Sequence, residues 1–166
     1  MILAVDVFYH QDFARTAGVL FDEWDAAELN QIIYSNTKDI KEYVSGSFYL
    51  RELPCILQLL KDHQVSPDVL IIDGYVFLDG YQQAGLGKYL FDELKGEIPV
   101  IGVAKNPYKA ISREYALWRG KSKHPLYVTA AGIDSGDAKE HIRRMHGDFR
   151  IPTLLKMADK LCRKLS

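Results

Sequence analysis

The sequence predicts an α/β protein with a mixed sheet, in which three antiparallel strands are followed by parallel strands and flanked by helices. Strand-like apolar runs at 1–8, 16–22 and 29–38 are joined by short breaks. Short connections favour an antiparallel meander, because a parallel pair needs a crossover of a dozen residues or more. After Ser47 the pattern changes to alternating helical and strand-like segments, which is typical of a sheet covered by helices.

The run at 68–73 is expected to be the central strand of this sheet. It contains four consecutive aliphatic residues and ends on Asp73, which Gly74 follows. Such a run is typical of a strand buried on both faces. Ligands of open α/β sheets bind beyond the carboxyl ends of the strands, and a glycine lets a ligand approach the backbone. The first strand also delivers a carboxylate, Asp6. If the two strands are neighbours, the carboxylates face one another and need a cation between them.

The remaining segments complete the fold. Apolar residues recur at helical spacing between Leu53 and Leu60. Pro54 is tolerated only in a first turn, which predicts that Glu52 lies at the helix N-terminus. Further strands are expected at 98–103, 112–118 and 126–130, and further helices at 86–94, 137–146 and 152–165. This order resembles the ribonuclease H-like fold, whereas a flavodoxin-like sheet would not open with a meander.

Length and composition indicate an ordinary globular chain. The 166 residues are expected to form one domain, 1–166, with 48% hydrophobic and 26% charged residues. No apolar run approaches the roughly 18 residues that a membrane span needs, and no basic leader precedes the first strand. Cys55 and Cys162 fall on apolar helical faces and are expected to be reduced. We therefore expect a cytoplasmic monomer without membrane association.

The segment 105–123 concentrates positive charge. The segment contains six basic residues but only one acidic residue, Glu114, and aromatic residues are interleaved with the basic ones. Basic and aromatic side chains together suit contact with phosphates and stacking on bases. A solvated surface ribbon is the alternative. The residues concerned are Lys105, Lys109, Arg113, Arg119, Lys121 and Lys123, with Tyr108, Tyr115 and Trp118.

Three carboxylates and a lysine are the candidate catalytic residues. Asp6 and Asp73 end strands, Glu52 opens a helix, and Lys105 follows another strand. Converging carboxylates repel one another unless a hard cation binds them, and Mg²⁺ or Mn²⁺ prefers oxygen ligands. Such a site activates water and stabilises the oxyanions of phosphodiester cleavage. The alternative is that these acids are dispersed around the sheet.

The chain resembles the endonuclease V family, the inosine-directed nucleases, almost from end to end. Each short motif is weak alone, but their common order is specific. The matching segments are Asp6, the wedge-like Glu42–Gly46, Phe48–Pro54, Ile72–Gly74, Pro99–Lys105, Pro125–Val128, Arg150–Pro152 and Ala158–Asp159.

The resemblance implies metal-dependent cleavage of the second phosphodiester bond 3′ of inosine or deoxyinosine, leaving a 3′-hydroxyl and a 5′-phosphate. It implies Mg²⁺ as the cofactor, with Mn²⁺ able to substitute, and inosine-containing DNA or RNA as the partner. It also implies that the metal-binding and catalytic carboxylates are Asp6, Glu52 and Asp73, and that Lys105 is a catalytic-site lysine. The expected substrate-binding residues are Tyr43 in the wedge, Gly46, Gly74, Lys121 and Lys123.

Three departures from the family pattern leave alternatives open. The loop 74–80 lacks the family's His-Pro-Arg, and Ala131–Asp134 stands where a further family histidine is expected. The wedge also lacks its flanking prolines. We do not expect Asp134 to replace the histidine as a metal ligand. A non-cleaving nucleic-acid-binding homologue and a ribonuclease H-like nuclease with another structural target remain as alternatives. The retained carboxylates and Lys105 argue against the first.

Overall fold

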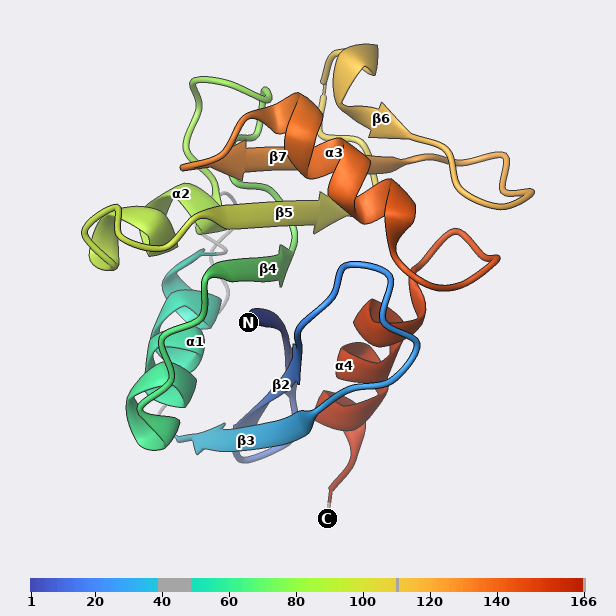
Figure 1. The fold of residues 1–166 in the computed structure, drawn as a ribbon. Coiled ribbons are helices and arrows are strands. Elements are labelled where there is room, and N and C mark those ends of the chain that lie inside the picture. The colour runs from blue at the N-terminus through green and yellow to red at the C-terminus, as the bar shows by residue number, and fades with distance from the viewer. Residues whose placement is uncertain (39–48, 110, 166) are drawn as a thin grey trace.

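The computed structural model describes residues 1–38, 49–109 and 111–165. These residues form a seven-stranded sheet in the order β3-β2-β1-β4-β5-β7-β6 (Figure 1). The strands are β1 Ile2–Tyr9, β2 Ala14–Phe21, β3 Gln31–Thr37, β4 Val69–Asp73, β5 Val100–Ala104, β6 Ala116–Leu117 and β7 Leu126–Ala131.

The strand directions confirm the predicted mixed sheet. β1 pairs antiparallel with β2, and β2 with β3, which is the expected meander. β1, β4 and β5 are parallel neighbours at the centre. Beyond β5, the strands β7 and β6 add an antiparallel edge. The carboxyl ends of β1, β4 and β5 therefore meet at one edge of the sheet.

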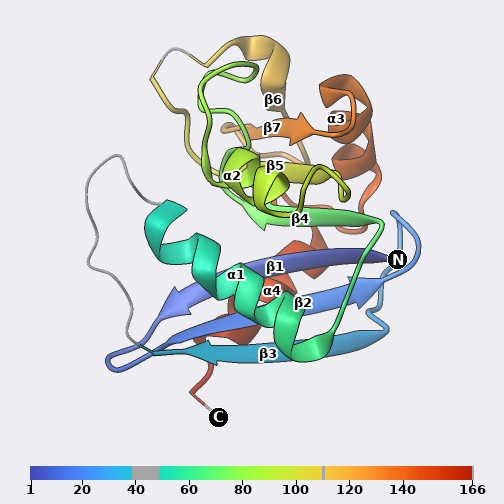
Figure 2. The same cartoon turned by 90° about the vertical axis from the view of Figure 1, so that its left-hand side faces the viewer.

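Helices cover both faces of the sheet (Figures 1 and 2). On one face lie α1, Tyr49–His63, and α2, Leu86–Glu93; α3, Ser135–Arg144, and α4, Thr153–Arg163, lie on the other. No helix in the described part of the chain combines the length and the apolar character needed to cross a membrane.

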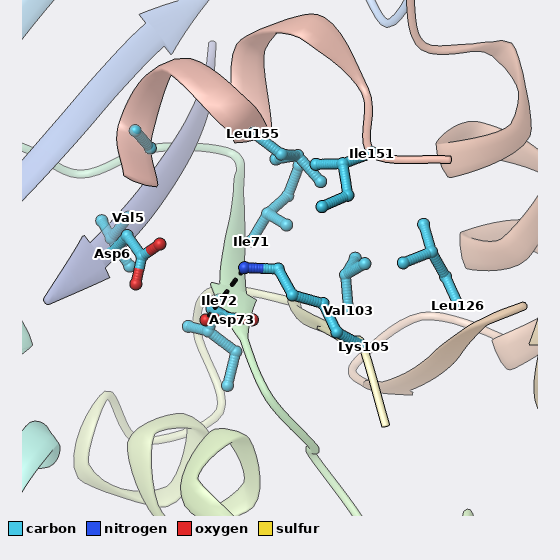
Figure 3. A pocket seen from close by; sticks show the side chains of 11 residues that line it. Val5, Asp6, Ile71, Ile72, Asp73, Val103, Lys105, Leu126, Ile151 and Leu155 are labelled. Atoms are coloured by element: carbon cyan, nitrogen blue, oxygen red, sulfur yellow. Dashed lines mark ion pairs between the residues drawn. The ribbon is translucent and has the colours of Figure 1, made fainter. Parts of the chain in front are cut away.

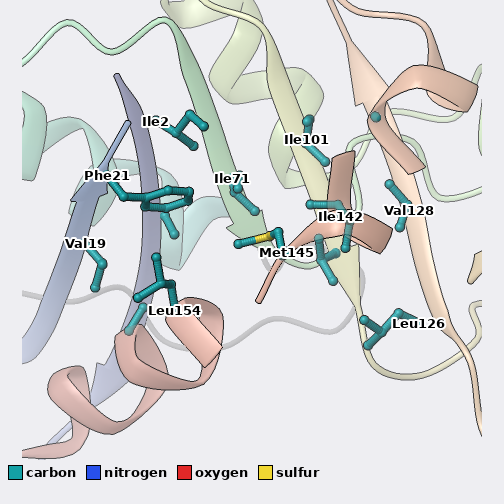
Figure 4. Packing of buried hydrophobic residues seen from close by; sticks show 14 of the residues in the cluster. Ile2, Val19, Phe21, Ile71, Ile101, Leu126, Val128, Ile142, Met145 and Leu154 are labelled. Atoms are coloured by element: carbon teal, nitrogen blue, oxygen red, sulfur yellow. The ribbon is translucent and has the colours of Figure 1, made fainter. Parts of the chain in front are cut away.

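Alternation along the central strands divides the core in two. Leu70 and Ile72 of β4 pack on the α1 side, whereas Ile71 packs on the other side with Leu154 of α4 (Figure 4). Ile71 and Leu154 are each 1% exposed. Burial of an aliphatic side chain of this size contributes roughly 1.5–3 kcal/mol. The same alternation in β1 determines which side chains point towards α4.

The start of α1 differs from the prediction. The helix begins at Tyr49, so Glu52 lies in its first turn, as expected, whereas Pro54 lies inside the helix rather than in the first turn. A proline there removes one backbone hydrogen bond, at a cost of about 3 kcal/mol. Burial of Ile56 and Leu59, exposed by 1% and 0%, offsets that cost.

The strand expected at 112–118 is largely wrong. Arg113–Tyr115 form a short 3-10 helix, and only Ala116–Leu117 pair as β6. The hydroxyl of Ser112 caps this turn by accepting from the backbone N–H of Glu114 at 3.4 Å. Tyr115 is 8% exposed and packs against Gly80, so burial of its ring favours the turn.

Candidate active site

β1 and β4 bring Asp6 and Asp73 to the same edge of the sheet. In their parallel register Ala4 lies opposite Ile71, and the two aspartates lie two residues further along each strand. Paired residues of parallel strands share a face, so both aspartates lie on the face that α4 covers. Both line one pocket together with Lys105 (Figure 3).

Lys105 enters this pocket because it directly follows β5, the neighbour of β4. Its Nζ lies 3.6 Å from Oδ2 of Asp73 and forms an ion pair with it (Figure 3). The predicted juxtaposition of Asp6, Asp73 and Lys105 is therefore present in the structure.

Gly74 keeps the backbone open beside this ion pair. Its φ of +131° belongs to a region that favours glycine, and no atom lies within 4 Å of the place of a Cβ. Its N–H donates to the carbonyl of Val103 at 3.0 Å, which holds the turn against β5. The turn thus leaves space for a ligand next to Asp73.

Glu52 approaches the site from the opposite face, at the first turn of α1. It is 8% exposed, and within the described segments no hydrogen bond or ion pair reaches its carboxylate. Burial raises its pKa well above the ordinary value, and the charges of Asp6 and then Asp73 raise it further. Glu52 does not line the pocket of the two aspartates. The charges of Asp6 and Asp73 nevertheless act on its carboxylate.

The electrostatics of the pocket favour a bound cation. Burial, followed by the charge of Asp73, raises the pKa of Asp6 to about 7, although Lys105 and the N–H of Val7, at 2.9 Å, oppose that shift. Burial also raises the pKa of Asp73, against the lowering effect of Lys105. With 42% of its side chain exposed, Asp73 is the better hydrated of the two. Facing carboxylates with a single lysine suit a hard divalent cation with oxygen ligands.

A fourth carboxylate, Asp159 of α4, was not assigned a role from the sequence. Ligand atoms of Asp6, Asp159 and Cys162 all lie within 4.8 Å of one another. Oδ1 of Asp159 also accepts from Nε of Arg163 at 3.0 Å. The family-like segment Ala158–Asp159 was the available signal, but only the packing of α4 on β1 brings this residue to the site.

A second, larger pocket adjoins the ion pair. It holds about 300 Å³ and is bordered by Asp73, Gly74, Tyr75, Leu78, Leu86, Ala104, Lys105 and Asn106. The Tyr75 hydroxyl donates to the carbonyl of Asn106 at 2.6 Å and accepts from the N–H of Tyr108 at 3.1 Å. These bonds fix the tyrosine in one wall. The volume lies at the lower end of the range for small-molecule sites.

The loop that replaces the family's His-Pro-Arg is held by Asp79. Its Oδ1 accepts from the backbone N–H groups of Tyr81, Gln82 and Gln83 at 3.1, 2.8 and 2.9 Å. The loop is therefore an ordered wall of the second pocket, to which it contributes Tyr75 and Leu78.

The basic segment 105–123 does not form one surface, which corrects the interpretation of Arg119 and Tyr115 as ligand-contacting residues. Arg119 is 6% exposed, and its guanidinium donates to the carbonyls of Met145, Gly147, Phe149 and Arg150. Tyr115 is a core residue. Lys121 and Lys123 are exposed between β6 and β7, so these two remain available to a phosphate backbone.

Three other residues were named in the sequence analysis, and the structure describes one of them. Tyr43 and Gly46 lie outside the described residues. Asp134 caps α3 by accepting from the N–H of Asp137 at 3.1 Å. The expectation that Asp134 does not serve as a metal ligand stays a prediction.

Comparison with known proteins supports the resemblance seen in the sequence. The profile of the Endonuclease V family matches residues 1–160. Endonuclease V of Streptomyces avermitilis is 27% identical, over 98% of this chain and 79% of its own length. Its crystal structure superposes with a TM-score of 0.77 over the same shares of the two chains.

Two further crystal structures share the fold. A variant of Ciona intestinalis Endonuclease V, in complex with a 23mer DNA containing an inosine followed by a ribo-adenosine, gives a TM-score of 0.75. It is 20% identical and covers 98% of this chain and 83% of its own. Human ENDOV gives a TM-score of 0.74 at 22% identity, over 98% and 82% of the two chains.

Proposed function

We propose that the chain, which belongs to the endonuclease V family and is an endonuclease, cleaves inosine-containing nucleic acid in a metal-dependent reaction. The reaction is hydrolysis of a phosphodiester bond 3′ of inosine or deoxyinosine. The observation that carries the proposal is the meeting of Asp6, Asp73 and Lys105 in one pocket beyond adjacent parallel strands. The polypeptide 1–166 acts as a single domain.

The donor set fits a hard divalent cation. Asp6 and Asp73 would hold Mg²⁺, with Mn²⁺ able to substitute, while Glu52 and Asp159 supply further negative charge nearby. A cation would stabilise two features of the site. One is the raised pKa of Asp6, and the other is the buried carboxylate of Glu52, which has no hydrogen-bond or ion-pair partner among the described residues. When bound, such an ion lowers the pKa of a water and neutralises the oxyanions of the phosphate.

The protein side chains then have separate roles. Asp6 and Asp73 orient the cation site, and ionised carboxylates there are able to accept the proton of an attacking water. Lys105 holds its ammonium beside Asp73, where it contacts a non-bridging phosphate oxygen and lowers the charge of the scissile group. Gly74 leaves room for the substrate backbone at this point.

Recognition of the altered base is assigned to the surroundings of Asp73. The pocket of about 300 Å³ next to the ion pair is open to solvent, and both apolar side chains and the polar Asp73, Lys105 and Asn106 border it, which suits a flipped purine with its polar edge. As the resemblance implies, we assign to Tyr43 and Gly46 the contact with the substrate beside the altered base, and we assign to Lys121 and Lys123 contacts with phosphates. The inosine in the DNA bound to the Ciona intestinalis relative supports this substrate class.

One assay tests the proposal. Labelled single- and double-stranded DNA and RNA, with and without one inosine, are incubated with the full chain and Mg²⁺ or Mn²⁺. We expect nicking at the second phosphodiester 3′ of inosine that stops in EDTA. Asp73→Asn should abolish nicking while binding persists, whereas Asp92→Asn, an exposed aspartate of α2, should nick normally.

Other results would replace the proposal. Binding without nicking, with either metal, would identify a non-cleaving homologue. Nicking that ignores inosine would identify a ribonuclease H-like nuclease with a different structural target. Full nicking by Asp73→Asn would show that other residues catalyse the reaction.

A further inference from the structure

A further pocket lies at the start of α4, and the proposed mechanism assigns it no role. It holds about 470 Å³ and is open to solvent. Ile151 borders both this pocket and the pocket of the two aspartates, so the two adjoin (Figure 3). We call it the Phe149 pocket, and the residues that border it are Phe149, Arg150, Ile151, Lys156 and Lys160.

Phe149 exposes its ring from a backbone that is held in place. The residue is 79% exposed. Its carbonyl accepts from the guanidinium of the buried Arg119 at 2.6 Å, and the same guanidinium binds the carbonyls of Met145 and Gly147. A single exposed hydrophobic residue is common on protein surfaces. The surroundings of the ring therefore decide whether it has a partner.

The surroundings of Phe149 are basic. Lys156 and Lys160 are exposed and lie four residues apart on α4, so they share one face of the helix. Among the described residues, no acidic side chain borders the pocket, and neither lysine forms an ion pair. Arg150 adds a third positive charge, which also lacks an ion pair in the described part of the chain. Positive charge thus gathers here although the whole chain has a net charge of -1.

We propose that the Phe149 pocket binds the part of the nucleic-acid strand that lies 3′ of the scissile phosphate. One base stacks on the ring of Phe149, and phosphates contact Lys156 and Lys160. An aromatic platform with cations beside it is the arrangement that binds single strands without regard to sequence. The position along the strand rests on the proposed function, whereas the binding of nucleic acid at this surface does not.

The order of the pockets determines which side of the strand lies here. The pocket assigned to the altered base shares Asp73 and Lys105 with the pocket of the two aspartates, and Leu86 of α2 borders it. The Phe149 pocket shares Ile151 with the pocket of the aspartates and lies on the side of α4. A strand that places its inosine in the first and its scissile phosphate at Lys105 continues towards Phe149. Because the bond that is cut lies 3′ of inosine, the continuing part is the 3′ side.

Fluorescence anisotropy in EDTA and low salt measures binding of the full chain without cleavage. Two labelled single-stranded DNA probes share one inosine and one 5′ flank. The long probe continues for several nucleotides beyond the scissile bond, and the short probe ends before it. We expect wild type to bind the long probe more tightly. Phe149→Ala should weaken long-probe binding by about 5–150-fold, the range for loss of one base–aromatic stack, and leave the short probe unchanged. Phe149→Trp should bind the long probe like wild type.

The lysines provide a second readout. Changing Lys156 and Lys160 together to glutamine should lower the salt slope of long-probe binding by about 1.4, since each single-strand phosphate contact contributes roughly 0.7. The matched control changes the exposed Lys61 of α1 and Lys95, which follows α2, to glutamine and should keep the slope. Tyr34→Ala removes a ring that is 38% exposed on the edge strand β3, and it should bind both probes normally.

Several results would overturn the proposal. One is a wild type that binds both probes alike, and another is a Phe149→Ala variant that binds the long probe normally or loses both probes equally. A wild type that elutes as a dimer, with Phe149→Ala as a monomer, would assign the pocket to a second copy of the chain.

The proposed function can fail separately. A wild type that binds but does not nick inosine strands would refute that function. An inosine-free strand would then still decide the surface, because stacking on an aromatic ring tolerates any base. We expect Phe149→Ala to bind this strand more weakly than wild type, and equal binding would overturn the surface.

Discussion

Replacing Asp6 by asparagine should make the metal-free protein more stable at high pH. The pKa of Asp6 is raised from 3.8 to about 7 by burial and by the charge of Asp73. At 1.36 kcal/mol per pKa unit, a shift of roughly three units corresponds to an upper limit of about 4 kcal/mol. Screening by water and relaxation of the carboxylates reduce this to about 2 kcal/mol.

The sign follows from proton binding. Between pH 3.8 and about 7 the folded state holds a proton on Asp6 that the unfolded state has lost. The stabilisation is complete below pH 3.8, declines as the pH rises through this window and is gone above pH 7. Asparagine resembles the protonated acid and keeps an oxygen for the N–H of Val7, so the variant should not show this decline.

Thermal unfolding followed by circular dichroism in EDTA, at half-unit steps from pH 4 to 8, measures the effect. With about 2–4 °C per kcal/mol for a chain of this size, Asp6→Asn should exceed the wild type by about 4–8 °C at pH 8 and by little at pH 4. The exposed Asp25→Asn is the control. A constant difference between Asp6→Asn and wild type across this range would refute the assigned electrostatics.

Three further outcomes are expected. Arg119→Ala should lower the melting temperature in calorimetry by about 3–12 °C, because four carbonyls lose a buried donor worth about 1.5–3 kcal/mol in total; a change below 2 °C would contradict this. Removing Lys121 and Lys123 together should weaken binding to all sequences alike and lower the salt slope by about 2 in anisotropy titrations; a loss of inosine preference alone would argue against phosphate contacts. Tyr43→Ala should weaken binding and cleavage of inosine substrates with an unchanged melting temperature, because an inserted aromatic contributes roughly 1–3 kcal/mol of stacking; a lower melting temperature with full activity would make Tyr43 a packing residue.

The sequence alone determined the strands of the central sheet and the position of two carboxylates. Buried strands are encoded locally, by aliphatic runs such as Val69–Ile72, and the residue that ends a strand is visible in the same pattern. The direction of β1–β3 followed from short connections. Because neighbouring parallel strands share an edge, Asp6, Asp73 and Lys105 were predicted to meet, and the structure brings them to one pocket.

Where local signals competed with packing, the sequence was a weaker guide. The aromatic and apolar residues of 112–118 read as a strand, but burial of the Tyr115 ring and the cap at Ser112 favour a 3-10 turn. Pro54 indicated a later start for α1, but the apolar face of that helix outweighs one lost hydrogen bond.

Only the tertiary structure decided which distant side chains join the site. Asp159 and Cys162 reach Asp6 because α4 packs on β1 and β2, and no local pattern records which strand a helix covers. Arg119 carries the charge of a ligand-binding residue, but its guanidinium donates hydrogen bonds to backbone carbonyls within residues 145–150 instead. Periodicity encodes which face of an element is buried, whereas the partner of that face depends on how the whole chain packs.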